Sequence, residues 1–412
     1  MTILNLAAIL VTLAAVFSFI NHRFIRLPTT IGLMLIALVL STLLVISGKL
    51  GLVAAPLYAQ QILSQIDFNT TLMHGMLSFL LFAGALHVNL NELSEQKWVI
   101  ASLATVGMVT SAFLVGTLSW YVLGWLDISL PFMYCLLFGA LISPTDPIAV
   151  MGILKTAGAP KSLEIKIAGE SLFNDGVAVV VFIVLLSIAT GGGSEVSVGE
   201  IALLFIEEAV GGIVFGFLIG FITYAMLRSV NNYQVEILLT LALVMGGYAL
   251  ATKLHVSGPL AMVVAGLMIG NHGRQFAMSD LTREHLDTFW QLLDEILNAV
   301  LFVLLGLELL VITFTENFLL ASALLIPIVI VVRFISVGIP VTILRLKREF
   351  SPHVVKILTW GGLRGGISIA LALSLPNGPE RELILTLTYI IVIFSIAVQG
   401  LTIGKVIRSY IK

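Results

Sequence analysis

The sequence predicts an all-α polytopic membrane protein with thirteen transmembrane helices, arranged as two inverted six-helix repeats with crossed discontinuous helices. Three observations lead to this fold class. The chain is 59% hydrophobic and only 11% charged, whereas a soluble domain carries about 25% charged residues. Apolar stretches of the roughly 20 residues that a bilayer span requires recur along the chain. Two of these stretches are interrupted by proline or glycine at corresponding places in the two halves.

Hydropathy and length place the thirteen spans along the whole chain. In order they are Thr2–Ile20, Leu27–Ser47, Thr70–Val88, Trp98–Leu123, Leu130–Leu154, Leu163–Ala189, Ile201–Leu227, Val235–Thr252, Gly258–Ile269, Phe289–Ile312, Phe318–Leu344, Val354–Leu375 and Leu383–Val406. The first span lacks the basic start and the cleavage site of a signal peptide, so we expect it to be retained.

The distribution of basic residues predicts the orientation. With thirteen spans, sixteen Lys and Arg residues fall on the connectors and tail of one face and three on the other, while Arg333 and Arg364 lie within spans. Cytoplasmic loops carry the excess of Lys and Arg. We therefore expect an outside N-terminus and a cytoplasmic C-terminus.

The chain is expected to form a single transmembrane domain over residues 1–412. Repeat one covers about 1–190, a linking helix covers about 200–228, and repeat two covers about 233–412. The odd linking helix gives the two blocks opposite orientation. The fifth span of the first block is broken by Pro144 and Pro147, and that of the second block by the glycines of Gly361–Gly366. Interrupted spans at matching positions indicate an inverted-repeat transporter.

The sixth predicted span carries four polar residues in an apolar stretch. At 3.6 residues per turn, Glu170 and Asn174 share one stripe, and Ser171 and Asp175 share the neighbouring stripe. Ionisable groups at membrane depth are costly and usually mark an ion or proton path. We therefore predict that Asp175 binds a proton or a cation in turn, with Asn174 orienting a nearby carboxylate. The structural alternative is an acid held by a helix partner.

Thr145 and Asp146 lie between the two prolines of the fifth span. Proline removes a backbone donor and frees a carbonyl one turn earlier, so we expect the helix to open here. The freed carbonyls, the Thr145 hydroxyl and the Asp146 carboxylate are oxygen ligands of the kind that an alkali cation requires. The alternative is a proline kink in which Asp146 is a satisfied buried polar group.

Glu170, Arg333 and Arg364 are charged residues deep within predicted spans. Neither Glu170 nor Arg333 can stay unpaired at membrane depth, so we predict an ion pair with a structural role. Arg364 lies among the glycines of the twelfth span, where it could repel cations or offset half-helix carbonyl dipoles. A pairing arginine near the cytoplasmic side is an equally good interpretation.

Asp294, Glu295 and Asn298 lie early in the tenth predicted span, where they could line an entrance or form a solvated helix end. The sequence contains no nucleotide-binding P-loop and no hydrolase motif, so we expect a transporter without ATP-driven pumping, not an enzyme. No cofactor is expected, and no basic tract suggests a nucleic-acid partner. The single cysteine, Cys135, excludes an intramolecular disulfide.

Three motifs together resemble those of a known family. They are Ser143–Val150, Gly169–Gly176 and Gly361–Gly366. In this order they are similar to the motifs of the monovalent cation:proton antiporters, and most similar to the NhaP-type bacterial Na+/H+ exchangers, which are related to the animal sodium/hydrogen exchangers. The resemblance covers nearly the whole membrane region.

This resemblance implies a homodimer in the bacterial inner membrane that works by elevator-like alternating access. Core helices would cover about 70–190 and 286–375, with the remaining helices on the dimer side. The cation site would comprise Thr145, Asp146, Ser171 and Asp175. Asn-Asp in the sixth span resembles the electroneutral members, which exchange one cation for one proton. Many relatives carry an acid in the third span, where this chain has Ala83, which cannot coordinate a cation.

The expected function is therefore secondary antiport of Na+ for H+, with Li+ and K+ as further candidate cations. A K+/H+ antiporter is a second hypothesis within the same class. A passive cation channel and a non-transporting membrane sensor are hypotheses from other classes.

Overall fold

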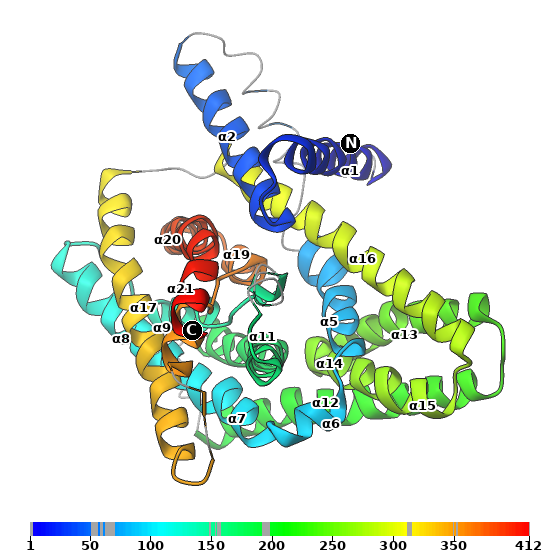
Figure 1. The fold of residues 1–412 in the computed structure, drawn as a ribbon. Helices are drawn as coiled ribbons and strands as arrows, with labels where there is room; N and C mark the ends of the chain where they lie inside the picture. The colour runs from blue at the N-terminus through cyan, green and yellow to red at the C-terminus, as the bar shows by residue number, and fades with distance from the viewer. Residues whose placement is uncertain are drawn as a thin grey trace.

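The computed structural model describes residues 3–50, 57, 61, 71–147, 150–152, 154, 158–191, 198–310, 315–348, 350–351 and 353–411. All regular elements within these residues are helical (Figure 1). Eight helices of this described part are long and apolar enough to cross a membrane: Ala7–Ile25, Thr29–Gly48, Lys97–Trp125, Lys161–Thr190, Leu203–Arg228, Tyr233–Lys253, Glu316–Leu344 and Pro379–Tyr410. The count of thirteen and the inverted repeats stay predictions.

The first half of the chain contains the helices that precede the linking helix. They are α1 (Ile3–Ile20), α2 (Thr29–Lys49), α5 (Leu77–Leu86), α6 (Leu90–Glu95), α7 (Lys97–Ser102), α8 (Met108–Trp125), α9 (Phe132–Ile142) and α11 (Lys161–Thr190). A π-helical segment, Leu103–Gly107, joins α7 to α8, so the long fourth span is one continuous helix.

The second half begins with α12 (Val198–Arg228), which corresponds to the predicted linking helix. The helices that follow are α13 (Tyr233–Lys253), α14 (Gly258–Met268), α15 (Arg274–Phe276), α16 (Asp280–Leu307), α17 (Glu316–Leu344), α18 (Val354–Trp360), α19 (Gly366–Leu373), α20 (Pro379–Phe394) and α21 (Leu401–Ile411).

Both predicted interruptions are present. Helix α9 ends at Ile142, and Pro144 to Pro147 have no regular structure; Ile148 and Ala149 lie outside the described residues. The glycine-rich segment 361–365 separates α18 from α19. Proline cannot donate the next helical hydrogen bond, and glycine lowers the cost of leaving the helix, so each interruption follows from its local sequence.

Helix α16 starts nine residues before the predicted span. Hydropathy predicts a start at Phe289, whereas the helix begins at Asp280. Its N-cap is Ser279, whose hydroxyl accepts a hydrogen bond from the Thr282 N–H at 3.3 Å. Such a cap fixes a helix start in polar sequence, which a search for apolar spans passes over. Asp294 therefore lies in the middle of a helix instead of near its end.

The helices pack around two hydrophobic clusters. One cluster unites side chains of α2, α8, α9, α17 and α20, and the other unites side chains of α5, α13 and α14. Helices α11 and α16 contribute to both clusters, and Figure 1 shows α11 in the centre of the molecule with α16 crossing beside α5. A site on α11 and α16 therefore lies between the two clusters.

Candidate functional site

The two helix interruptions meet in space. The Asp146 N–H donates a hydrogen bond to the Leu363 carbonyl at 2.7 Å, which joins the proline break directly to the glycine break. The Arg364 guanidinium donates from Nη1 to the carbonyl oxygens of Ser143 and Pro144, the latter at 2.9 Å. Carbonyls at a helix end have no helical partner. Arg364 therefore stabilises the end of α9, which favours the carbonyl-offset hypothesis over the pairing arginine.

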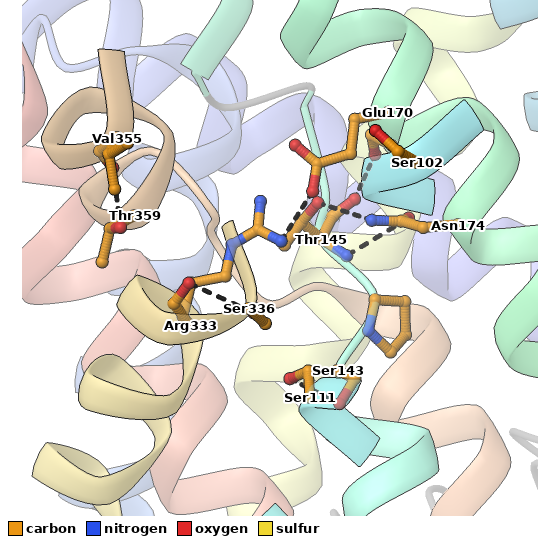
Figure 2. Close-up of polar contacts among 12 residues, drawn as sticks. Ser102, Ser111, Ser143, Thr145, Glu170, Asn174, Arg333, Ser336, Val355 and Thr359 are labelled. Atoms are coloured by element: carbon orange, nitrogen blue, oxygen red, sulfur yellow. Dashed lines mark hydrogen bonds and ion pairs between the residues drawn. The ribbon is translucent and has the colours of Figure 1, made fainter. Parts of the chain in front are cut away.

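Helix α11 holds Thr145 in place from the other side. The Ser171 hydroxyl donates to the Thr145 carbonyl. The Asn174 Nδ2 donates to the Thr145 Oγ1 at 3.0 Å (Figure 2). All three residues are buried. The open segment between the prolines is therefore a fixed structure, because hydrogen bonds from α11 replace those that a continuous helix would have made.

Asp146 and Asp175 line the same cavity, which has a volume of about 600 Å³. Thr145 and Ser171 also line it. The cavity thus brings together carboxylate, hydroxyl and carbonyl oxygens, the donors that hard cations prefer.

Asn174 has a different position from the other predicted ligands. It is buried, its amide is engaged with Thr145, and it is absent from the residues that line the cavity. Asn174 therefore lies outside the cavity lining, and its hydrogen bond holds the candidate ligand Thr145 in position.

Glu170 and Arg333 form a buried ion pair next to this site, with 2.6 Å between Arg333 Nη1 and Glu170 Oε1 (Figure 2). Their side chains are 2% and 5% exposed. Among the residues that the structure describes, Glu170 Oε1 and Arg333 Nε have no hydrogen-bond partner with good geometry, so the ion pair is the main polar contact of this carboxylate oxygen. Neither residue lines the cavity. The position of the pair is compatible with a structural role, which stays a prediction.

The backbone of the glycine break lies in close contact with the side chains of Arg333, Thr145 and Asp146. A Cβ atom added at Gly362 would lie 2.7 Å from Arg333 Nε and 3.1 Å from Thr145 Cγ2. A Cβ at Gly365 would overlap the Asp146 carboxylate. A larger residue at either position would force the Arg333 or the Asp146 side chain to move, so close approach favours glycine at both.

Helix α16 supplies a polar side to the cavity. Asp294 and Glu295 line it together with Gln291, whose Nε2 donates to Glu295 Oε1 at 3.1 Å. Asn298 is buried and donates to the Asp294 carbonyl at 2.9 Å. Of the two interpretations left open for these residues, the cavity lining holds for the two acids, because the early start of α16 moves them away from the helix end.

Two polar lining residues, Gln291 on α16 and Ser368 on α19, carry no strong signal in the sequence. Gln291 could have been found from its spacing of three and four residues to Asp294 and Glu295, which places all three on one helix face. Ser368 on α19 is buried, lines the cavity, and its hydroxyl has no hydrogen-bond partner among the described residues. A serine two residues after a glycine run carries no such signal by itself.

The side of the cavity formed by α5 lacks a carboxylate. Ala83 and Gly84 line it, as does His87, whose Nδ1 lies 2.8 Å from the Ala83 carbonyl. Because Nδ1 is engaged along the helix, Nε2 is the ring nitrogen left to face other groups. No acid takes the place of Ala83 among the described residues of α5.

Comparison with known proteins gives a consistent result. A family model described as "Sodium/hydrogen exchanger, transmembrane" matches residues 9–408. The chain is 53% identical over 409 residues to the Na+/H+ antiporter NhaP of Pseudomonas aeruginosa, covering 98% of this chain and 96% of that protein. It is 34% identical over 416 residues to the Na+/H+ antiporter NhaH of Halobacillus dabanensis, covering 99% and 96%.

A solved structure has a similar fold. The sodium proton antiporter MjNhaP1 from Methanocaldococcus jannaschii, determined at pH 8, matches with a TM-score of 0.76 and 20% sequence identity. The match covers 98% of this chain and 97% of that one.

Proposed function

The chain belongs to the transmembrane sodium/hydrogen exchanger family, and on this basis we propose that it is a secondary antiporter that exchanges Na+ for H+. Relatives that align over nearly their whole length are named Na+/H+ antiporters, which supports this pair of substrates. The proposed location is the bacterial plasma membrane, with the N-terminus outside and the C-terminus in the cytoplasm.

In this proposal Asp175 holds the proton or the cation in turn, and Asp146, Thr145 and Ser171 supply further oxygen ligands. The observation that carries it is the shared cavity of Asp146 and Asp175 at the meeting point of the two helix breaks. Two carboxylates in a site of low dielectric repel each other, and one added positive charge relieves the repulsion. A proton and Na+ neutralise the same group, so binding of one opposes binding of the other.

The proposed stoichiometry is one Na+ for one H+. Asn174 is neutral and is already hydrogen-bonded to Thr145, so it adds no second exchangeable charge beside Asp175. If Asp175 alone changes its occupant during the cycle, each crossing of the membrane carries one positive charge in either direction. The exchange is then electroneutral.

The proposed mechanism of access is an elevator-like movement of a core formed by about 70–190 and 286–375. Buried polar contacts support a core that moves as one body, since they join the breaks to each other and α11 to α17. Helix α12 exposes large apolar side chains such as Phe217 at 60% and Phe221 at 54%, a surface that a second subunit can cover. We assign α12 and the other remaining helices to the dimer side of a homodimer.

Transport into proteoliposomes that contain a pH-sensitive dye tests the proposal. A Na+ gradient should drive opposite H+ movement without net current, and Asp175→Asn should abolish it. Asp280→Asn is the matched control, since Asp280 is an acid at the exposed start of α16, paired with Arg283; it should leave the rate within twofold. Na+ flux through the parent protein that carries current without H+ movement would indicate a channel and refute exchange. Retained exchange in Asp175→Asn would remove that residue from the mechanism.

A further inference from the structure

The turn between α1 and α2 is a concentrated basic segment. It carries His22, Arg23 and Arg26, and the first acidic residue of the chain is Asp67. Within the described part of the chain, neither arginine side chain forms an ion pair or a hydrogen bond with another residue. The positive charges of this turn are therefore not neutralised by nearby protein groups.

The turn is held in one conformation by a buried side chain. The Asn21 Nδ2 donates to the Leu27 carbonyl at 2.8 Å, and the Leu27 N–H donates back to Asn21 Oδ1 at 3.2 Å. Asn21 is 3% exposed and fits against Gly32, where any side chain would overlap it. The arginines are thus attached to a rigid frame.

Arg26 adopts a backbone conformation that favours glycine. Its φ is 61° and its ψ is 31°, and its N–H donates to the Asn21 carbonyl at 2.6 Å. A residue with a Cβ is uncommon in this left-handed region. Glycine would close the turn with less strain, so the arginine at this position suggests a use for its side chain.

An open depression in the surface of the turn is lined by His22, Arg23 and Arg26. The hydroxyl-bearing residues Ser18 and Thr29 also line it. Helix α2 begins at Thr29 and has no side-chain cap, so its first N–H groups can also interact with an anion. The depression is thus lined by cationic, hydroxyl and backbone hydrogen-bond donors, and the oxygens of a phosphate group accept hydrogen bonds from all three.

The position of the turn indicates the source of that phosphate. It lies between two candidate spans, Ala7–Ile25 and Thr29–Gly48, so it must lie at a membrane surface. Phe19 and Phe24 beside it are 66% and 71% exposed. Exposed aromatic side chains next to basic residues are typical of the boundary between lipid headgroups and acyl chains. A free anion in water would make no favourable contact with these rings, whereas a phospholipid places its acyl chains beside them.

We propose that this turn binds the phosphate headgroup of an anionic phospholipid through Arg23, Arg26 and His22. Polybasic segments next to a span attract anionic lipid. Here the turn is also rigid, so its basic side chains can bind one headgroup at a defined place. The proposal does not depend on the exchange activity.

Titration of the purified full-length protein with phosphatidylglycerol, phosphatidylcholine or inorganic phosphate tests it, with native mass spectrometry and thermal unfolding as readouts. The parent should bind phosphatidylglycerol and gain thermal stability, and Arg23→Gln/Arg26→Gln should bind it at least tenfold more weakly. Arg345→Gln/Lys347→Gln, in the exposed turn after α17, should behave as the parent.

Arg26→Gly separates binding from folding, because it removes a charge and suits the left-handed backbone. We expect it to be at least as stable as the parent without lipid, yet to bind phosphatidylglycerol more weakly. Equal phosphatidylglycerol binding by the double variant and the parent would overturn the proposal. So would inorganic phosphate that stabilises the parent as much as phosphatidylglycerol does.

Discussion

Breaking the Glu170–Arg333 ion pair should reduce stability while leaving cation binding nearly intact. The two side chains are buried, their charged atoms are 2.6 Å apart, and neither lines the cavity that contains Asp146 and Asp175. Arg333→Met keeps most of the side-chain volume but leaves the Glu170 carboxylate buried without a partner. Removing one member of a buried pair costs about 3–5 kcal/mol.

A double-mutant cycle isolates this coupling. Glu170→Gln should also destabilise the protein, whereas Glu170→Gln/Arg333→Met should lose less than the sum of the two single variants, with a coupling of about 1–3 kcal/mol. Unfolding in mixed detergent micelles measures the free energies, and transport assays measure the apparent KM for Na+, which we expect to stay within about threefold. Lys161→Ala is the control, since its partner Glu92 forms a largely exposed pair, for which the expected loss is at most about 1 kcal/mol.

Two outcomes would refute the reasoning. One is an Arg333→Met variant as stable as the parent, because a buried carboxylate without a countercharge cannot be free of cost. The other is a well-folded Arg333→Met variant with altered preference between Na+ and K+. That result would place the pair in the cation site itself.

Further predictions concern the cavity. Lowering the pH by one unit, in the range where the proton occupies Asp175, should raise the apparent KM for Na+ by up to about tenfold with little change in maximal rate, because both ions compete for that carboxylate; initial rates at several pH values measure this. Gly365→Ala should weaken Na+ binding at least tenfold, because the added methyl group overlaps the Asp146 carboxylate, and Na+ titration of the transport rate measures it. Ala83→Glu should lower the apparent KM for Na+ and slow turnover, because it adds a carboxylate to the cavity lining; kcat and KM for Na+, measured separately, report the two changes.

Each of these predictions has a control. A maximal rate that falls in parallel with pH, at constant KM, would contradict competition at a single group. Gly246→Ala is matched to Gly365→Ala, since a Cβ at Gly246 meets no atom within 4 Å, and equal behaviour of the two variants would contradict the proposed contact with Asp146. Ala83→Gln has a similar volume to Ala83→Glu without its charge, so an equal change in KM for both variants would assign the effect to size.

The elements that carry the site could be predicted because their signals are local. Pro144 and Pro147 lack backbone donors, and the glycines after Trp360 disfavour a continuous helix, so each break is determined where it occurs. Polar residues in an apolar stretch likewise identify α11 as the helix that carries the candidate site, since burying polar groups in a membrane is costly.

The partners of those residues could not be predicted with the same certainty, because they lie far away in the sequence. Nothing near Arg364 indicates that its guanidinium reaches the carbonyls of Ser143 and Pro144, and nothing near Asn174 indicates that its amide is directed to Thr145. The lining role of Asp294 depended on a capped start of α16 outside the apolar stretch.

Sequence alone thus determined the class of the protein, the positions of the breaks and the residues that cannot be left unpaired in a membrane. These follow from hydropathy, backbone chemistry and the cost of burying charge, which act on each residue where it stands. Tertiary structure decided which carboxylates share a cavity and which polar groups only position others. Helix packing sets those distances, and packing depends on contacts between segments that are distant in the sequence, from 29 residues for Asn174 and Thr145 to 220 for Arg364 and Pro144.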